Sequence, residues 1–164
     1  RRRVREIISL TGQYAAVDDK LTGRENLRMM GRLAHHPRRT VDHRVDELLL
    51  AFDLTDAADR LVATYSGGMR RRLDLAAGLL DRPVVLFLDE PTAGLDPIGA
   101  AAFDTLLRTL QQALGLTVFL ITHDLDTLYA ICDRVAVLAD KKVIAVGTID
   151  ELLALEHPWI QEYQ

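Results

Sequence analysis

Hydrophobic residues change their spacing along the chain near residue 66. Before that point they recur every three or four positions, which is the spacing of one face of an α-helix. This pattern predicts a helix after Thr22, where Glu25 completes a capping box, and a second helix from about Thr40. Residues 5–10 precede both helices and are predicted to form a short strand. Residues 22–63 are therefore predicted to be mostly helical.

After Ser66, predicted helices alternate with short, continuously apolar strands. Strands separated by helices pair in parallel, and strands that are apolar throughout suit a sheet covered on both sides. We therefore predict an α/β fold, with a mostly parallel sheet flanked by helices and a helical subdomain. The predicted elements are a helix over 67–80, a strand over 84–88, a helix over 97–114, a strand over 117–122, a helix over 124–132, a strand over 134–139 with an edge hairpin partner over 143–146, and a helix over 150–155.

Composition fits one globular unit and narrows the possible partners. Of the 164 residues, 49% are hydrophobic and 27% are charged, and the formal net charge is -4. Bulk attraction to nucleic acid is therefore not expected, and Arg70, Arg71 and Arg72 are interpreted as the solvated face of a helix. The single cysteine, Cys132, excludes an internal disulfide framework and is typical of a reducing cytosol. No uninterrupted apolar stretch reaches the length of a bilayer span.

Two carboxylates, Asp89 and Glu90, directly follow the predicted strand over 84–88. In an open parallel sheet, ligands bind beyond the carboxyl ends of the strands. One carboxylate there can hold Mg²⁺ through its water shell, and a second can polarise an attacking water. Alternatively, the pair caps the turn before Pro91.

Glycines also open the helix that precedes this strand. Ser66, Gly67 and Gly68 place free backbone amides at a helix N-terminus, where they and the helix dipole attract phosphate. Ser66 can equally cap its own helix, and a Ser-Gly-Gly sequence by itself is also common in ordinary loops.

Polar residues also close two further predicted strands. His123 follows the strand over 117–122 and can donate to a γ-phosphate, and Gln13 follows the first strand and can contact Mg²⁺ or water. The alternatives are a structural histidine and a polar turn residue.

In this order the motifs resemble those of the ATP-binding domain of ABC transporters, over nearly the whole chain. The resemblance implies a P-loop NTPase fold of the ABC type that hydrolyses ATP with Mg²⁺. It also implies a role for each matching residue. Gln13 corresponds to the Q-loop glutamine, which senses Mg²⁺. The signature motif, which contacts ATP held by a partner subunit, corresponds to Ser66, Gly67, Gly68 and Met69. Asp89 corresponds to the Walker B aspartate, Glu90 to the catalytic glutamate, Asp96 to the D-loop aspartate, and His123 to the switch histidine.

One motif of the family, the phosphate loop or Walker A motif Gly-x-x-x-x-Gly-Lys-Ser/Thr, occurs nowhere in the 164 residues. We therefore expect an N-terminally truncated ATPase subunit that by itself binds ATP poorly, does not hydrolyse it, and aggregates through exposed core strands. Three segments are predicted: residues 1–20 as the end of the N-terminal core with the Q-loop, residues 21–65 as the helical subdomain, and residues 66–164 as the signature helix and C-terminal α/β core.

Two subfamilies are resembled by different parts of the chain. Residues 11–15, 21–27 and 65–73 resemble daunorubicin-resistance-type drug exporter ATPases. Residues 123–129, 139–142 and 157–163 resemble Mla-type ATPases of phospholipid transport. The hypothesis is a sequence that joins two related ATPases, and the alternative is an intermediate subfamily.

The family resemblance also implies partners and a location. It implies the ATPase subunit of a bacterial ABC transporter that exports a drug or lipid, bound to a transmembrane permease at the cytoplasmic face of the inner membrane. A second nucleotide-binding domain completes an ATP sandwich, and nucleic acid is not an expected partner. The alternatives are a Mla-type phospholipid-trafficking ATPase, a non-transport ABC protein and an inactive half-cassette.

Overall fold

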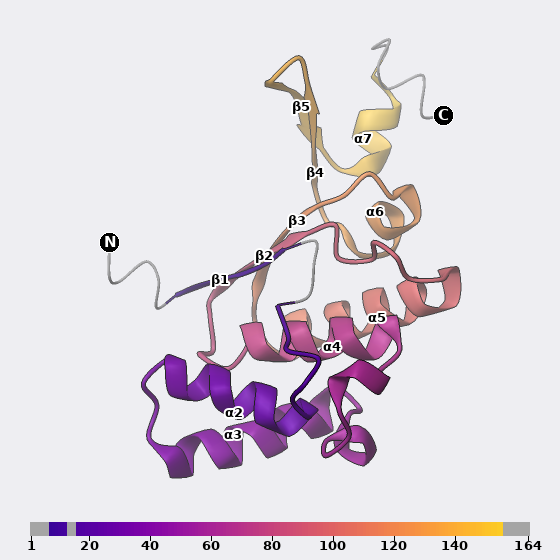
Figure 1. The fold of residues 1–164 in the computed structure, drawn as a ribbon. Helices are drawn as coiled ribbons and strands as arrows, with labels where there is room; N and C mark the ends of the chain where they lie inside the picture. The colour runs from indigo at the N-terminus through magenta and orange to yellow at the C-terminus, as the bar shows by residue number, and fades with distance from the viewer. Residues whose placement is uncertain (1–6, 13–15, 156–164) are drawn as a thin grey trace. The chain divides into compact units, whose positions relative to one another are not determined.

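The computed structural model describes residues 7–12 and 16–155, and the chain divides into two compact units, residues 1–122 and residues 123–164 (Figure 1). This division cuts across the predicted segment 66–164, and the three predicted segment boundaries stay a prediction. The first unit contains β1 (Ile8–Thr11), α2 (Gly23–Leu33), α3 (Arg38–Ala51), the short 3₁₀ helices η1 (Thr55–Ala57) and η2 (Val62–Thr64), α4 (Gly67–Gly78), β2 (Val85–Asp89), α5 (Pro97–Leu114) and β3 (Thr117–Ile121). The second contains α6 (Leu125–Ile131), β4 (Val135–Ala139), β5 (Lys142–Gly147) and α7 (Ile149–Leu153).

A three-stranded parallel sheet in the order β1-β2-β3 forms the centre of the first unit. Its register places Leu10 beside Phe87 and Phe87 beside Phe119, so β2 lies between the other two strands. Because parallel strands need a long crossover, α5 connects β2 to β3. This arrangement confirms the predicted α/β fold with a parallel sheet and flanking helices.

Helices α4 and α5 lie on the same side of this sheet (Figure 1). Helix α4 approaches so closely that a Cβ atom at Gly78 would lie 2.9 Å from Ser9 Oγ and 3.2 Å from Thr11 Oγ1. On this side of the sheet Leu86 and Leu88 are fully buried. One apolar core of the unit therefore lies between the sheet and these two helices, and a second is formed by α2, α3 and the residues that follow them.

The alternate residues of the strands are exposed, contrary to the expected burial of both faces. Leu10 is 74% exposed, Phe119 57% and Ile121 60%, and the rings of Phe87 and Phe119 stand 5.7 Å apart between centroids. The expectation for the strand over 117–122 is therefore wrong. Side chains alternate between the two faces of a strand, and only the face that carries Leu86 is covered by α4.

Local sequence chemistry sets the ends of the helices. Thr22 and Glu25 form the predicted capping box at α2, and Asp96 caps α5 with Pro97 in the first turn. Gly115 ends α5 in a left-handed conformation, with φ at 63°. Helix α3 begins at Arg38, two residues earlier than predicted.

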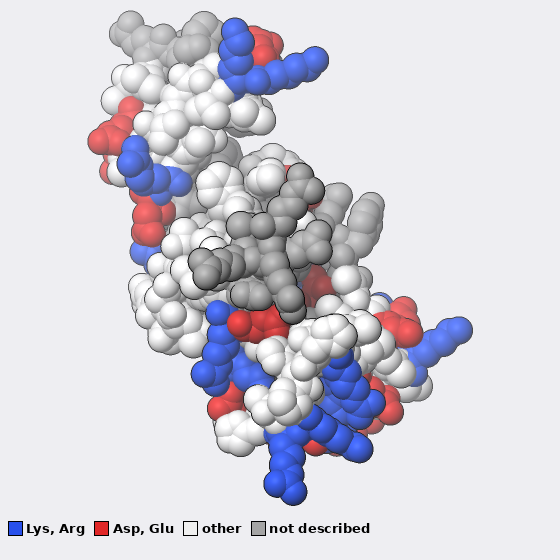
Figure 2. All heavy atoms as spheres, turned by 90° about the vertical axis from the view of Figure 1, so that its left-hand side faces the viewer, with Lys and Arg blue, Asp and Glu red and all other residues white. Residues whose placement is uncertain are grey.

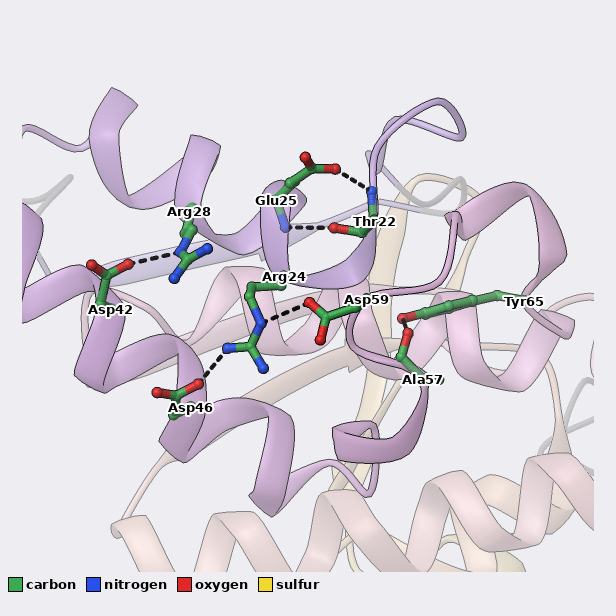
Figure 3. Close-up of polar contacts among 9 residues, drawn as sticks. All are labelled: Thr22, Arg24, Glu25, Arg28, Asp42, Asp46, Ala57, Asp59 and Tyr65. Carbon is green, nitrogen blue, oxygen red and sulfur yellow. Dashed lines mark hydrogen bonds and ion pairs between the residues drawn. The ribbon is translucent and has the colours of Figure 1, made fainter.

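Helices α2 and α3 belong to a helical segment, residues 21–65, in which the chain before α2 lies beside the chain that follows η1. The amide of Val62 donates to the carbonyl of Leu21 at 2.9 Å, and Thr22 and Leu61 form an antiparallel bridge. The buried hydroxyl of Tyr65 donates to the Ala57 carbonyl at 2.6 Å (Figure 3). Because Tyr65 immediately precedes Ser66, this bond anchors the start of α4 to the helical segment.

Acidic and basic side chains are interspersed on the helical segment, which forms the lower part of Figure 2. Arg28 pairs with Asp42 at 2.7 Å, and Arg24 bridges Asp59, at 3.0 Å, and Asp46 (Figure 3). Such exposed pairs each contribute about 0–1 kcal/mol, so they add little to stability.

The second unit is built around an antiparallel hairpin. Strands β4 and β5 pair with each other, and the turn between them contains Asp140 and Lys141, both with positive φ. Two successive left-handed residues give the turn a twist that matches an antiparallel hairpin. The predicted hairpin is therefore confirmed, and α7 follows it behind a second capping box formed by Thr148 and Glu151.

Among the residues that the structure describes, none of the helices combines the length and the apolar character that crossing a membrane demands.

Gly31 offers a test of the packing between α2 and α3. A Cβ atom there would lie 2.8 Å and 2.9 Å from the two γ-methyl groups of Val41. Overpacking costs about 1–3 kcal/mol, and the better helix propensity of alanine offsets roughly 1 kcal/mol. Gly31→Ala is therefore expected to lower the free energy of unfolding in urea by about 1 kcal/mol.

The matched control is Gly68→Ala, because a Cβ atom at Gly68 meets nothing within 4 Å. This variant is expected to be neutral or stabilising. The double variant Gly31→Ala/Val41→Ala should lose less stability than the sum of the two single changes. Strict additivity would contradict the proposed contact.

Candidate functional site

The candidate site lies at the carboxyl ends of the three parallel strands. Gly12 follows β1, Glu90 follows β2, and Thr122 follows β3. Because the strands are parallel and Asp89 is in register with Ile121, these residues lie along the same edge of the sheet. Ligands of open parallel sheets bind at this edge. Gln13 lies outside the described residues.

Glu90 stands at the turn out of the central strand in an unusual backbone conformation. Its φ is 46°, in the left-handed region that non-glycine residues rarely adopt. Its amide donates to the Ile121 carbonyl at 2.8 Å, and its Oε2 accepts from the Thr122 hydroxyl at 3.3 Å. Strands β2 and β3 therefore hold both the backbone and the carboxylate of Glu90.

Asp89 is the last residue of β2 and is partly exposed. Within the described ranges, no cluster of three or more His, Cys, Asp or Glu side chains forms a metal site. Mg²⁺ usually keeps several waters and binds through one or two carboxylates together with substrate phosphates. The oxygen donors of Asp89 and Glu90 fit that mode of binding.

The signature residues start α4 beside the loop that precedes α5. Ser66 caps the helix by accepting a hydrogen bond from the Met69 amide at 3.3 Å, so the alternative that it is a helix cap is also true. A Cβ atom at Gly67 would lie 3.6 Å from Leu95 Cδ2 and 3.9 Å from the Gly94 carbonyl. Ser66 and Gly67 are exposed, so their amides are accessible at a helix N-terminus.

Asp96 and His123 occupy different surroundings. The Asp96 Oδ1 atom accepts from the Gly99 amide at 2.9 Å, so this residue has a structural role as the cap of α5. His123 is exposed and is the first residue of the second unit. The contacts of Asp96 and His123 with nucleotide stay predictions that rest on their places in the motif order.

Arg71 contradicts the interpretation of the three arginines as a solvated helix face. Its side chain is almost fully buried, with the residue 5% exposed. Nε donates to the Pro91 carbonyl at 2.7 Å, Nη1 to Gly12 at 2.7 Å, and Nη2 to Asp89 at 3.2 Å and Glu90 at 3.3 Å. The physical reason is that these backbone carbonyls replace the water that a buried guanidinium loses.

Asp74 lies one helical turn after Arg71 and is buried beside it. Its Oδ1 accepts from the Ala16 amide at 2.9 Å, and its Oδ2 stands 3.5 Å from Arg71 Nη1. Burial raises the pKa of the Asp74 carboxyl, against the hydrogen bond from Ala16 and the charge of Arg71. Burial also lowers the pKa of the Arg71 guanidinium, while the charges of Asp74 and Asp89 raise it. The only sequence signal for this pair is an Arg and an Asp three positions apart on a helix.

A parallel sheet with Asp89 and Glu90 at the end of its central strand, and a glycine-started helix beside it, matches the P-loop NTPase fold of the ABC type. The solved structure of CbiO1 from Clostridium perfringens, described as part of the ABC transporter complex CbiONQ, shares this fold. Its TM-score is 0.85 at 31% identity, over 93% of this chain and 61% of that one. Residues 1–93 match the family model described as ABC transporter, and the chain belongs to that family.

Its relatives include drug-resistance ATP-binding proteins of Streptomyces. The chain is 52% identical over 151 residues to the daunorubicin resistance ATP-binding protein DrrA3 of Streptomyces coeruleorubidus, covering 92% of this chain and 48% of that protein. It is also 52% identical over 149 residues to the daunorubicin/doxorubicin resistance ATP-binding protein DrrA of Streptomyces peucetius, covering 91% and 45%. The chain therefore spans about half the length of these curated relatives. The predicted drug-exporter resemblance is confirmed and extends over most of the chain, whereas the Mla-type resemblance is not shown.

The conformation of Glu90 predicts an unusual order of stability among variants. The left-handed region costs an L-residue roughly 1–2 kcal/mol, and the greater freedom of glycine in the unfolded chain offsets part of this. The free energy of unfolding, measured in urea, should therefore be about 1 kcal/mol higher for Glu90→Gly than for Glu90→Ala.

Asp89 supplies the control, because it lies within β2 and outside the positive-φ residues. There the order should reverse, since glycine in a strand is less stable than alanine by roughly 0.5–1 kcal/mol. The same order at both positions would argue against a strained backbone at Glu90.

Proposed function

We propose that this chain acts in the ATP-hydrolysing subunit of a bacterial ABC transporter that exports a drug. The observation that carries the proposal is the placement of Asp89 and Glu90 at the carboxyl end of the central strand, where Glu90 is held by Ile121 and Thr122. The choice of a drug as substrate is supported by the names of the daunorubicin resistance relatives. The lipid-trafficking alternative has no such support.

In this proposal Glu90 orients and polarises the water that attacks the γ-phosphate. The Thr122 hydroxyl donates to Oε2 of Glu90, and Glu90 is partly exposed at the carboxyl end of the sheet. Asp89 and Gln13 would hold Mg²⁺, partly through water, and His123 would position the γ-phosphate. When bound, Mg²⁺ neutralises charge that develops on the phosphate oxygens.

Residues Ser66 to Met69 serve the ATP of a second nucleotide-binding domain in this proposal. The exposed start of α4 offers backbone amides and the positive end of a helix dipole, which favour a phosphate group. Two such domains would close around ATP and act on a transmembrane permease through the segment that carries Gln13. This arrangement places the subunit at the cytoplasmic face of the inner membrane.

Removing the proposed general base tests the role of Glu90 in the assembled transporter. Glu90→Gln keeps the shape and the oxygen that accepts from Thr122, but it lowers the basicity of the side chain. We expect kcat for ATP hydrolysis to fall by at least about 100-fold, with ATP still bound. Glu47→Gln, on the surface of α3, is the control and should leave kcat unchanged.

Substrate class is tested in the same preparation. Daunorubicin is expected to stimulate the ATPase, and a phospholipid is not. Stimulation by phospholipid alone would replace drug export with lipid export, and unchanged hydrolysis in Glu90→Gln would remove Glu90 from the mechanism.

The 164-residue chain purified by itself gives a second test. Its sequence has no phosphate loop to supply the Lys and amides that hold the β- and γ-phosphates. We expect no Mg²⁺-dependent ATPase above background in a phosphate-release assay. Activity that disappears in Glu90→Gln would show instead that this chain hydrolyses ATP unaided.

A further inference from the structure

Helix α4 is bonded to two different parts of the candidate site through a single pair of side chains. Arg71 binds the carbonyls of Gly12, Asp89, Glu90 and Pro91, and Asp74 binds the amide of Ala16. We call Arg71, Asp74 and these five backbone groups the α4 clamp. All its members lie in the first unit.

The clamp holds the chain on both sides of the segment that contains Gln13. Arg71 Nη1 fixes the carbonyl of Gly12 before it at 2.7 Å, and Asp74 Oδ1 fixes the amide of Ala16 after it at 2.9 Å. The same guanidinium fixes three successive carbonyls of the turn that carries the Asp89 and Glu90 side chains. A shift of either segment therefore changes the hydrogen bonds of the other.

Stability alone does not account for this pair. A buried ion pair often adds no net stability over apolar side chains of similar volume, because both charges lose their water. Asp74 Oδ2 is buried and, in the described part of the chain, accepts no hydrogen bond. The arrangement instead suits a role in fixing the positions of several backbone groups, since a guanidinium presents five N–H donors in one rigid plane.

We propose that the α4 clamp is a positioning device for ATP hydrolysis, which sets the backbone of Glu90 relative to Gly12 and Ala16. This inference rests on the proposed function, because it assigns Arg71 and Asp74 to the same reaction. Neither residue is a catalytic residue, and each acts through the backbone groups that it binds.

The first test is steady-state ATPase kinetics of the assembled transporter with Arg71→Lys. Lysine keeps the charge, but its single ammonium cannot reach four carbonyls that are arranged around a planar fork. Misplacing a catalytic group by about 1 Å costs on the order of 100-fold, so kcat should fall by roughly that factor. KM for MgATP should stay within a factor of about 3, because Arg71 donates to backbone carbonyls and not to the side chains proposed to hold Mg²⁺ or to the amides of Ser66 to Met69.

Arg44→Lys is the matched control. Arg44 is also largely buried and donates to a backbone carbonyl, that of Leu79, at 2.9 Å, but it lies in α3 away from the motifs. It should leave both kcat and KM unchanged at a comparable thermal stability. Equal losses of kcat in the two variants, or an unchanged kcat in Arg71→Lys beside an inactive Glu90→Gln, would overturn the proposal.

Asp74 provides a second test, and its hydrogen-exchange readout does not depend on activity or on the folding of Arg71→Lys. Asp74→Asn retains an oxygen that can accept from Ala16, whereas Asp74→Ala removes it. Hydrogen exchange at the Ala16 amide should be faster in Asp74→Ala than in Asp74→Asn, and Asp74→Ala should lose more kcat. Equal exchange at Ala16 in the two variants would overturn the role of Asp74, while loss of ATPase from the unmodified transporter would instead overturn the proposed function.

Discussion

The first unit depends on a positive charge that is buried where parallel strands end. A guanidinium that has lost its water is stable only if other acceptors surround it, and carbonyls at the ends of β1 and β2 are those acceptors. The carbonyls of Gly12 and Pro91 belong to chain that has left the strand ladder, and Arg71 supplies a hydrogen-bond donor to each of them. The guanidinium therefore gains acceptors while these carbonyls gain a donor, and the loops at the site are fixed by a helix.

The sequence predicts most helix ends because a helix cap depends only on residues that are near it in the sequence. Thr22 with Glu25, Ser66, and Asp96 with Pro97 each bond or constrain residues within four positions, so no distant contact has to be known. Gly115 ends α5 for the same kind of reason, a backbone conformation that glycine adopts without strain. The order of motifs likewise predicts which carboxylates lie beyond the central strand.

The features that escape prediction depend on residues that are distant in sequence. The burial of Arg71 requires knowing that Gly12 and Pro91 lie against the same helix face, and the amino-acid pattern around three arginines gives no such information. The exposure of Phe119 is missed for a similar reason. An apolar strand indicates that both of its faces can pack against other elements, but it does not show which elements cover them. The roles toward nucleotide that are assigned to Gln13, Asp96 and His123 rest on the family resemblance.

The bond between the Glu90 amide and the Ile121 carbonyl continues the β2–β3 ladder by one step beyond β2. The carboxylate is therefore located by sheet register, at the same step where Thr122 meets it. A slip of one residue between these strands would move the hydroxyl by about 3.3 Å and turn it to the opposite face of the sheet. Insertions or deletions within β3 are thus far more damaging to the site than their distance along the sequence suggests, whereas changes of side chain on the exposed face of the same strand leave the register intact.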